Sequence, residues 1–207
     1  VFAFVSELNK ITIIYNGKTT EYTRKKEGET QTKNTFVSRI FNSTSDKIIN
    51  IFSIARDGIM LAVEIEQRGH KNHIVRYNSN LPKIFCDFPL LGTNDFSFPV
   101  VINSPFFNPT EPRNGIFLAD NESEQNKELI AKACELYSSL ISYFIENNYQ
   151  DIHNIVIIPD ATEKDWIDIN WYDEEILSLL KSNISNLPLF HMCDNTTKSL
   201  GADEWDD

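Results

Sequence analysis

The chain has 207 residues, of which 41% are hydrophobic, so it can bury a core and is globular rather than disordered. Its formal net charge is −11, and this average field would repel a polyanion, which argues against nucleic-acid binding. No apolar run is long enough for a membrane span and no basic-then-apolar leader opens the chain, so the sequence predicts a protein that is neither membrane-inserted nor secreted.

The cysteines and the first residues indicate the setting of the chain. Cys86, Cys134 and Cys193 are odd in number and lie far apart, without CxxC spacing, so neither a disulfide framework nor a zinc site is expected. This usage favours a reducing, cytoplasmic compartment. The opening VFAFV resembles the inside of a strand and has no initiating Met, so we expect a piece excised from a longer polypeptide.

The first half of the chain carries hairpin signals. Asn16-Gly17 and Asp57-Gly58 each lie between two β-rich runs, and these dipeptides tolerate the positive φ angles of tight two-residue turns. NHIVRYN and PKIFCDFPLL predict further strands. The apolar patch over residues 36–41 fits either a single helical turn or a strand.

In the second half of the chain, the spacing of the apolar residues changes to that of a helix. Over residues 126–148, apolar residues recur three and four apart and predict one face of a helix: Leu129, Ala133, Leu136, Leu140, Ile141 and Phe144. Residues 152–160 predict a strand, residues 173–188 a second helix, and LPLFHMC a last strand. We therefore expect an α+β fold: an antiparallel strand-rich part over 1–121, then a helix-strand-helix part over 122–207 packed on the sheet, in one continuous domain.

Common catalytic motifs are missing from the sequence. Only 7 glycines are present, without a GxxxxGK[ST] or GxGxxG loop, so this piece is not expected to bind a nucleotide by itself. No GxSxG elbow is present, and neither Ser104 nor the histidines have triad spacing. His70 and His73 would reach a metal from a helical turn, but the neighbouring Gly and Asn favour a solvated hairpin turn, so no metal site is expected.

An acidic and aromatic segment follows residue 159. Its acids would supply paired carboxylates for glycoside or metal-assisted hydrolysis only at a suitable separation in space, and helix-capping or surface roles are the commoner interpretation: Asp160, Asp165, Asp168 and Asp173. Trp166, Trp171 and Tyr172 fit a sugar platform or core anchors, and aromatics near a helix start favour the second.

The stretch FPVVINSPFFNPTEPRNGIFLADN, residues 98–121, runs from an apolar strand into a proline-rich loop that carries Arg113. In one interpretation the loop is a plain connection, and Arg113 is exposed or paired with Glu111. In the other, a stiff loop positions the guanidinium to stabilise a phosphate held elsewhere. By themselves the residues favour the plain connection.

Residues 88–118 resemble a segment of large proteins related to sacsin and, more remotely, to the ninety-kilodalton heat-shock chaperones. In that family a histidine-kinase-like (Bergerat) ATPase domain is followed by a β-rich region with a Phe-Pro-Leu, spacer, Pro-Val-x-x-Asn run, then an Arg and an apolar strand. The matching residues here are Phe88-Pro89-Leu90, Pro99-Val100, Asn103, Arg113 and Ile116-Phe117-Leu118. Beside Arg113, where the family often has a second basic residue, this chain has Pro112 and Asn114.

The resemblance implies the middle region of a chaperone-like ATPase, with no cofactor in this piece and ATP and magnesium bound upstream of Val1. Arg113 would contact the γ-phosphate, and Asn103 would shape its loop through side-chain to backbone hydrogen bonds. Partners would be the upstream ATPase domain and a protein client. The alternative is a structural or protein-interaction module without catalytic role, and a free-standing hydrolase ranks last.

Overall fold

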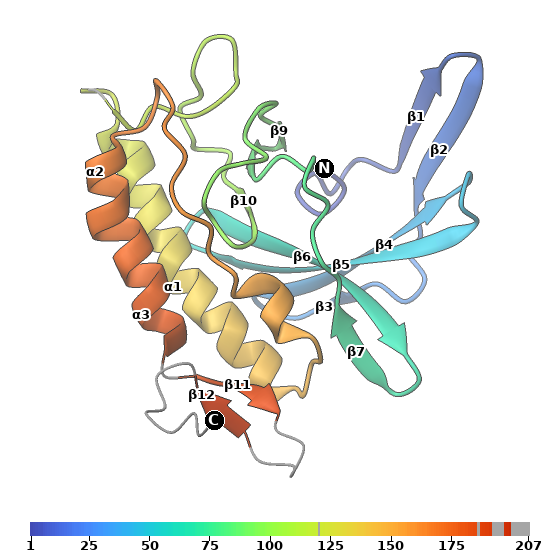
Figure 1. The fold of residues 1–207 in the computed structure, drawn as a ribbon. Coiled ribbons are helices and arrows are strands. Elements are labelled where there is room, and N and C mark those ends of the chain that lie inside the picture. The colour runs from blue at the N-terminus through green and yellow to red at the C-terminus, as the bar shows by residue number, and fades with distance from the viewer. Residues whose placement is uncertain (120, 186, 192–196, 200–207) are drawn as a thin grey trace.

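The computed structural model describes residues 1–119, 121–185, 187–191 and 197–199. It has an α+β fold, in which a strongly curled sheet carries helices on one face (Figure 1). The sheet has ten strands, in the order β1-β2-β4-β5-β6-β10-β8-β9, with β3 beside β4 and β7 beside β6. The strands are β1 Lys10–Tyr15, β2 Lys18–Arg24, β3 Thr30–Gln31, β4 Thr35–Asn42, β5 Lys47–Arg56, β6 Ile59–Arg68, β7 Lys71–Ile74, β8 Ile84–Cys86, β9 Phe88–Pro89 and β10 Val101–Asn103.

Both predicted hairpins are confirmed. β1 and β2 join through Asn16 and Gly17, whose φ angles are 49° and 72°, and β5 and β6 join through Asp57 and Gly58, at 51° and 80°. Positive φ at both central residues gives the turn a twist that matches the flanking strands, which explains why these dipeptides stand there. Residues 36–41, which fitted two interpretations, lie within β4.

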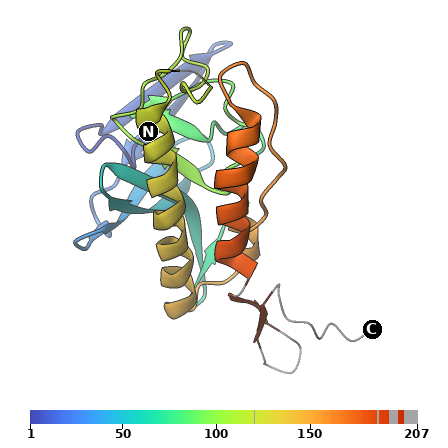
Figure 2. The same ribbon diagram turned by 90° about the vertical axis from the view of Figure 1, so that its left-hand side faces the viewer.

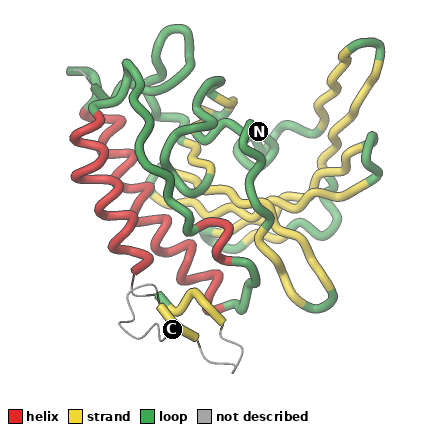
Figure 3. Tube along the Cα trace, in the orientation of Figure 1, coloured by secondary structure: helices red, strands yellow, loops and turns green. Residues whose placement is uncertain are grey.

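One strand makes the sheet mixed instead of purely antiparallel. β10 pairs antiparallel with β6, with Val101 opposite Ala62, and parallel with β8, with Ile102 opposite Ile84. The chain leaves the buried centre of the sheet at the end of β10 and passes through a long loop to the first helix (Figure 3).

Two helical segments lie side by side against the sheet (Figure 2). The first is α1, Glu124–Glu146; the second is continuous over α2 Ile169–Trp171, the π-helical η2 Tyr172–Leu177 and α3 Ser178–Ser185. The predicted apolar face of α1 is confirmed, because all six of its residues are buried: Leu129, Ala133, Leu136, Leu140, Ile141 and Phe144. Among the described residues, no helix combines the length and apolar character that a bilayer crossing requires.

The strand predicted over 152–160 is wrong. A short 3-10 helix, η1 Ile152–Ile155, stands there and no strand follows it before α2. Gln150 bridges to His73 of β7, but Asp151, at φ 62°, turns the chain away from that strand. Local bonds then satisfy the backbone, such as Asn154 N–H to the Asp151 carbonyl at 3.0 Å. Residues 124–185 therefore form helix, 3-10 helix and helix.

The last elements that the structure describes form a small two-stranded sheet. β11 Pro188–His191 pairs antiparallel with β12 Thr197–Ser199, and β11 lies within the last predicted strand. Cys193 and the acidic segment GADEWDD lie outside the described residues. A single buried cluster combines β5, β6 and β10 with α1 and α3, for example Phe52, Ile102 and Leu140, while the division at residues 121 and 122 stays a prediction.

Candidate functional site

The Arg113 loop, residues 104–118, folds as a small hairpin at one end of the molecule. Pro109 and Ile116 form an antiparallel bridge, and Thr110 N–H donates to the Gly115 carbonyl at 3.0 Å. The hydroxyl of the buried Thr110 donates to Asn114 Oδ1 at 2.8 Å. These bonds fix the turn that carries Arg113 at its tip.

A buried asparagine of α1 holds the base of the Arg113 loop. The Asn126 side chain is 0% exposed, and its Oδ1 accepts from Asn108 N–H at 2.8 Å. Its Nδ2 donates to the carbonyls of Asn108 at 2.8 Å and Phe117 at 2.9 Å. A single side chain therefore ties both arms of the hairpin to the first turn of the helix.

The other side of the loop is held by an aromatic ring. The Trp166 ring lies so close to Gly115 that a Cβ there would come within 2.3 Å of Trp166 Cε2. A side chain at position 115 therefore requires the Trp166 ring to shift. Leu118 and Ile167 form a parallel bridge next to this contact, so the segment before α2 supports the loop along its return arm.

Arg113 itself is exposed at the tip. Its φ is 68°, in the left-handed region, and its backbone N–H donates to the Thr110 carbonyl. Within the part of the chain that the structure describes, its guanidinium makes no hydrogen bond or ion pair, with Glu111 or any other residue. The five donors of the guanidinium are therefore available to a ligand or partner.

Asn103 is buried at the end of β10, and the structure does not join it to Arg113. Its side-chain oxygen accepts from the backbone N–H of Asp87 at 2.8 Å. Asp87 has a φ of 61° and lies in the turn between β8 and β9. The bond therefore stabilises that turn, and a contribution of Asn103 to the Arg113 loop stays a prediction.

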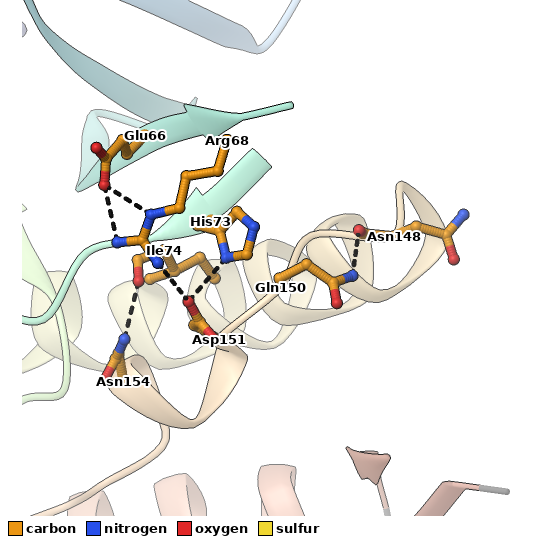
Figure 4. A network of polar contacts seen from close by, with 8 residues as sticks. All are labelled: Glu66, Arg68, His73, Ile74, Asn148, Gln150, Asp151 and Asn154. Atoms are coloured by element: carbon orange, nitrogen blue, oxygen red, sulfur yellow. Dashed lines mark hydrogen bonds and ion pairs between the residues drawn. The ribbon is translucent and has the colours of Figure 1, made fainter. Parts of the chain in front are cut away.

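A second polar site joins β7 to the turn before η1 (Figure 4). His73 Nδ1 lies 2.9 Å from Asp151 Oδ2, and Arg68 Nη1 approaches the same oxygen at 3.7 Å. Asn154 Nδ2 donates to the Ile74 carbonyl at 2.8 Å in the same network. The turn at His70 is the hairpin expected from the sequence, and no group of three or more metal-ligating side chains occurs in the described ranges.

The acidic and aromatic segment is structural where its contacts are defined. Asp168 caps the second helical segment by accepting from Trp171 N–H at 3.2 Å. Trp166 packs against Gly115, and Lys127 Nζ lies 4.6 Å from the centre of the Trp171 ring. The capping acid and the aromatic anchors agree with the interpretation favoured from the sequence.

Sequence reasoning proposed Arg113 as a site residue, which stays a prediction, and it did not single out Asn126 or Asp151. Asn126 follows Asn108 by 18 positions, and Asp151 follows His73 by 78. A usable signal for Asn126 was its polar side chain at the start of a helix next to the apolar stripe. Asp151 carried no comparable signal.

Comparison with protein-family models, with curated proteins and with solved structures finds no match for this chain.

Proposed function

We propose that this chain is the non-nucleotide-binding region next to the ATPase domain of a cytoplasmic chaperone-like protein, and that it couples the nucleotide state to contact with a client or partner. The observation that carries the proposal is an exposed Arg113 guanidinium, without a partner among the described residues, on a loop held at both sides. The resemblance of residues 88–118 to sacsin-like proteins supports it from the sequence.

The chemistry of the proposal is electrostatic. A guanidinium presents parallel N–H donors that match two phosphate oxygens, and an arginine placed on a transferring phosphoryl group stabilises the charge that develops there. Because Asn126 and Trp166 fix the loop, little conformational freedom of its backbone is lost when the arginine engages. ATP and magnesium would be bound by the adjoining domain, and Arg113 would complete that site.

Turnover of ATP by the full-length polypeptide tests the proposal. We expect Arg113→Ala to lower kcat by about a hundredfold, the scale of losing a charge-stabilising donor, with an unchanged urea midpoint. Arg113→Lys should recover only part of the rate, because an ammonium lacks the planar fork. Lys33→Ala removes one exposed positive charge elsewhere and should leave turnover unchanged. Equal turnover of wild type and Arg113→Ala would refute the role.

A protein-interaction module without catalytic role is the second candidate, and exposed apolar side chains favour it. Phe88, Leu91 and Phe106 are 56%, 70% and 59% exposed. A Cβ on Gly92 would lie 3.8 Å from Asn114, so the segment with Leu91 adjoins the Arg113 loop. Aromatic residues and arginine are enriched at protein interfaces.

The sequence upstream of Val1 discriminates the two candidates. An Asn-bearing helix followed by glycine-rich nucleotide loops is required if Arg113 contacts a nucleotide, and it is not required for an interaction module. In the second case, Leu91→Asp should weaken partner binding while ATP turnover, if the polypeptide has any, stays at the wild-type rate.

A further inference from the structure

The hairpin of β1 and β2 projects from the body of the protein as a two-stranded arm (Figure 1). β2 pairs with β4 only over residues 22–24, so among the described elements no third strand lies beside the part of the arm nearer its turn. Three apolar side chains of β1 are exposed there, Ile13 at 49%, Ile14 at 74% and Tyr15 at 74%. A two-stranded ribbon by itself is only marginally stable, so these side chains gain little from folding and are available to a partner.

The backbone of β1 is open along the same edge. Arg24 N–H donates to the Asn9 carbonyl at 2.8 Å, so Asn9 directs its carbonyl toward β2. In an antiparallel pair this direction alternates from residue to residue. Lys10, Thr12 and Ile14 therefore direct their N–H and C=O groups away from β2, and in the described ranges no other strand pairs with β1.

The other edge strands of the ten-stranded sheet are protected. β3 and β9 have two residues each, and β9 contains Pro89. β7 carries Lys71, and its His73 bridges to Gln150. Short strands, proline and lysine prevent an edge from pairing with another chain. By contrast, β1 has six residues without proline, and its one charged residue, Lys10, stands at its end.

A further strand would satisfy both features of β1 at once. A lipid surface would cover the apolar side chains but would leave the outward N–H and C=O groups without partners, which is costly in an apolar medium. A strand of another chain supplies both hydrogen bonds and apolar contacts. The edge of β1 therefore favours strand pairing over membrane contact.

A second copy of β1 is a suitable partner strand. In antiparallel pairing about a two-fold axis at Ile13, this residue faces its own equivalent, and Ile11 faces Tyr15 of the second copy. Thr12 faces Ile14 of the second copy, and both of these residues direct their backbone groups outward. Cross-strand pairs of β-branched and aromatic residues stabilise a sheet.

The charges of the arm are compatible with this pairing. Lys10 and Lys18 are the charged residues within residues 10–20. Lys10 would face the uncharged Asn16 of the second copy, and Lys18 lies on β2, away from the joined edge. No like charges would therefore stand directly opposite each other.

We propose that two copies of this chain associate through their β1 edges, which joins the two sheets across a two-fold axis at Ile13. Thr12 and Ile14 exchange backbone hydrogen bonds with each other's equivalents on both sides of the axis. The proposal does not depend on the role of Arg113.

Sedimentation velocity of the intact chain tests it. We expect a monomer–dimer equilibrium with a Kd of about 10 µM, because one pair of strands buries a small interface. Thr12→Pro removes an N–H that points away from β2, so it should leave the hairpin intact and weaken the dimer at least about tenfold.

Charge substitutions test the register. Thr12→Lys combined with Ile14→Glu places opposite charges face to face on both sides of the axis, and its Kd should stay within about threefold of wild type. Thr12→Lys combined with Ile14→Lys, or Thr12→Glu combined with Ile14→Glu, places like charges there. Each of these should weaken the dimer at least about tenfold.

Ile48→Lys is the matched control. Ile48 is 45% exposed but lies on β5, between β4 and β6, so its variant should dimerise as wild type does. Urea unfolding confirms that each variant is folded. A wild type that stays monomeric at about 200 µM, a dimer that survives Thr12→Pro, equal Kd values for the opposite-charge and like-charge combinations, or loss of the dimer in Ile48→Lys would each overturn the proposal.

Discussion

Replacing Asn126 by Ala should destabilise the protein through the Arg113 loop. The substitution removes three hydrogen bonds, to Asn108 N–H and to the carbonyls of Asn108 and Phe117, from a site that is 0% exposed. A hydrogen bond contributes about 1 kcal/mol net, so the free energy of unfolding should fall by about 3 kcal/mol. For a chain of this size, that corresponds to a Tm lower by about 6 to 12 °C.

Urea unfolding followed by circular dichroism measures this loss, and hydrogen exchange of the loop amides locates it. Asn147→Ala is the matched control, because its Nδ2 makes one exposed bond, to the Tyr143 carbonyl at 2.8 Å. That variant should change stability by no more than about 0.5 kcal/mol. A loss below about 1 kcal/mol for Asn126→Ala would show that the loop does not depend on this side chain.

Three further predictions concern separate contacts. Gly115→Ala should lower the free energy of unfolding by about 1 to 3 kcal/mol, because the added methyl group overpacks against Trp166. In a Trp166→Leu background the loss should be smaller. Equal losses in both backgrounds, measured by urea unfolding, would contradict this prediction. A double-mutant cycle of His73→Gln and Asp151→Asn should give a coupling of about 1 kcal/mol, and a coupling near zero would mean that the 2.9 Å contact is not stabilising. Burial lowers the pKa of Lys83 from 10.5 to about 8, so Lys83→Met should be more stable than wild type by about 3 kcal/mol at neutral pH. That gain should shrink as the pH rises through 8 toward 10.5, because wild type recovers stability when Lys83 is neutral in both states, and a gain independent of pH would refute the assignment.

Local signals in the sequence predicted local structure well. The hairpin turns need residues that accept φ angles of 49° to 80°. Asn-Gly and Asp-Gly are dipeptides that accept such angles, so the turns can be predicted from two residues. The apolar spacing of α1 likewise follows from the geometry of a single helix. The strand predicted over residues 152–160 was wrong because a short apolar run indicates that a segment is buried but does not distinguish a strand from a helix.

In the candidate site, too, features that are local in the chain could be predicted and features that join distant segments could not. Arg113 could be proposed as a site residue because prolines and a cation stand close together in the chain. Asn126, Trp166 and Gly115 form the support of the loop across separate elements, and no short window of the sequence contains that arrangement.

The position of β10 has a consequence for synthesis on the ribosome. β10 fills the place between β6 and β8, although both precede it in the chain. The β6 edge at Met60 to Ala62 therefore stays open while roughly forty further residues are made, or about 2 to 8 s at ordinary translation rates. During that interval a nascent chain exposes an apolar strand edge, which is the kind of surface that general chaperones bind and that otherwise pairs with a neighbouring chain.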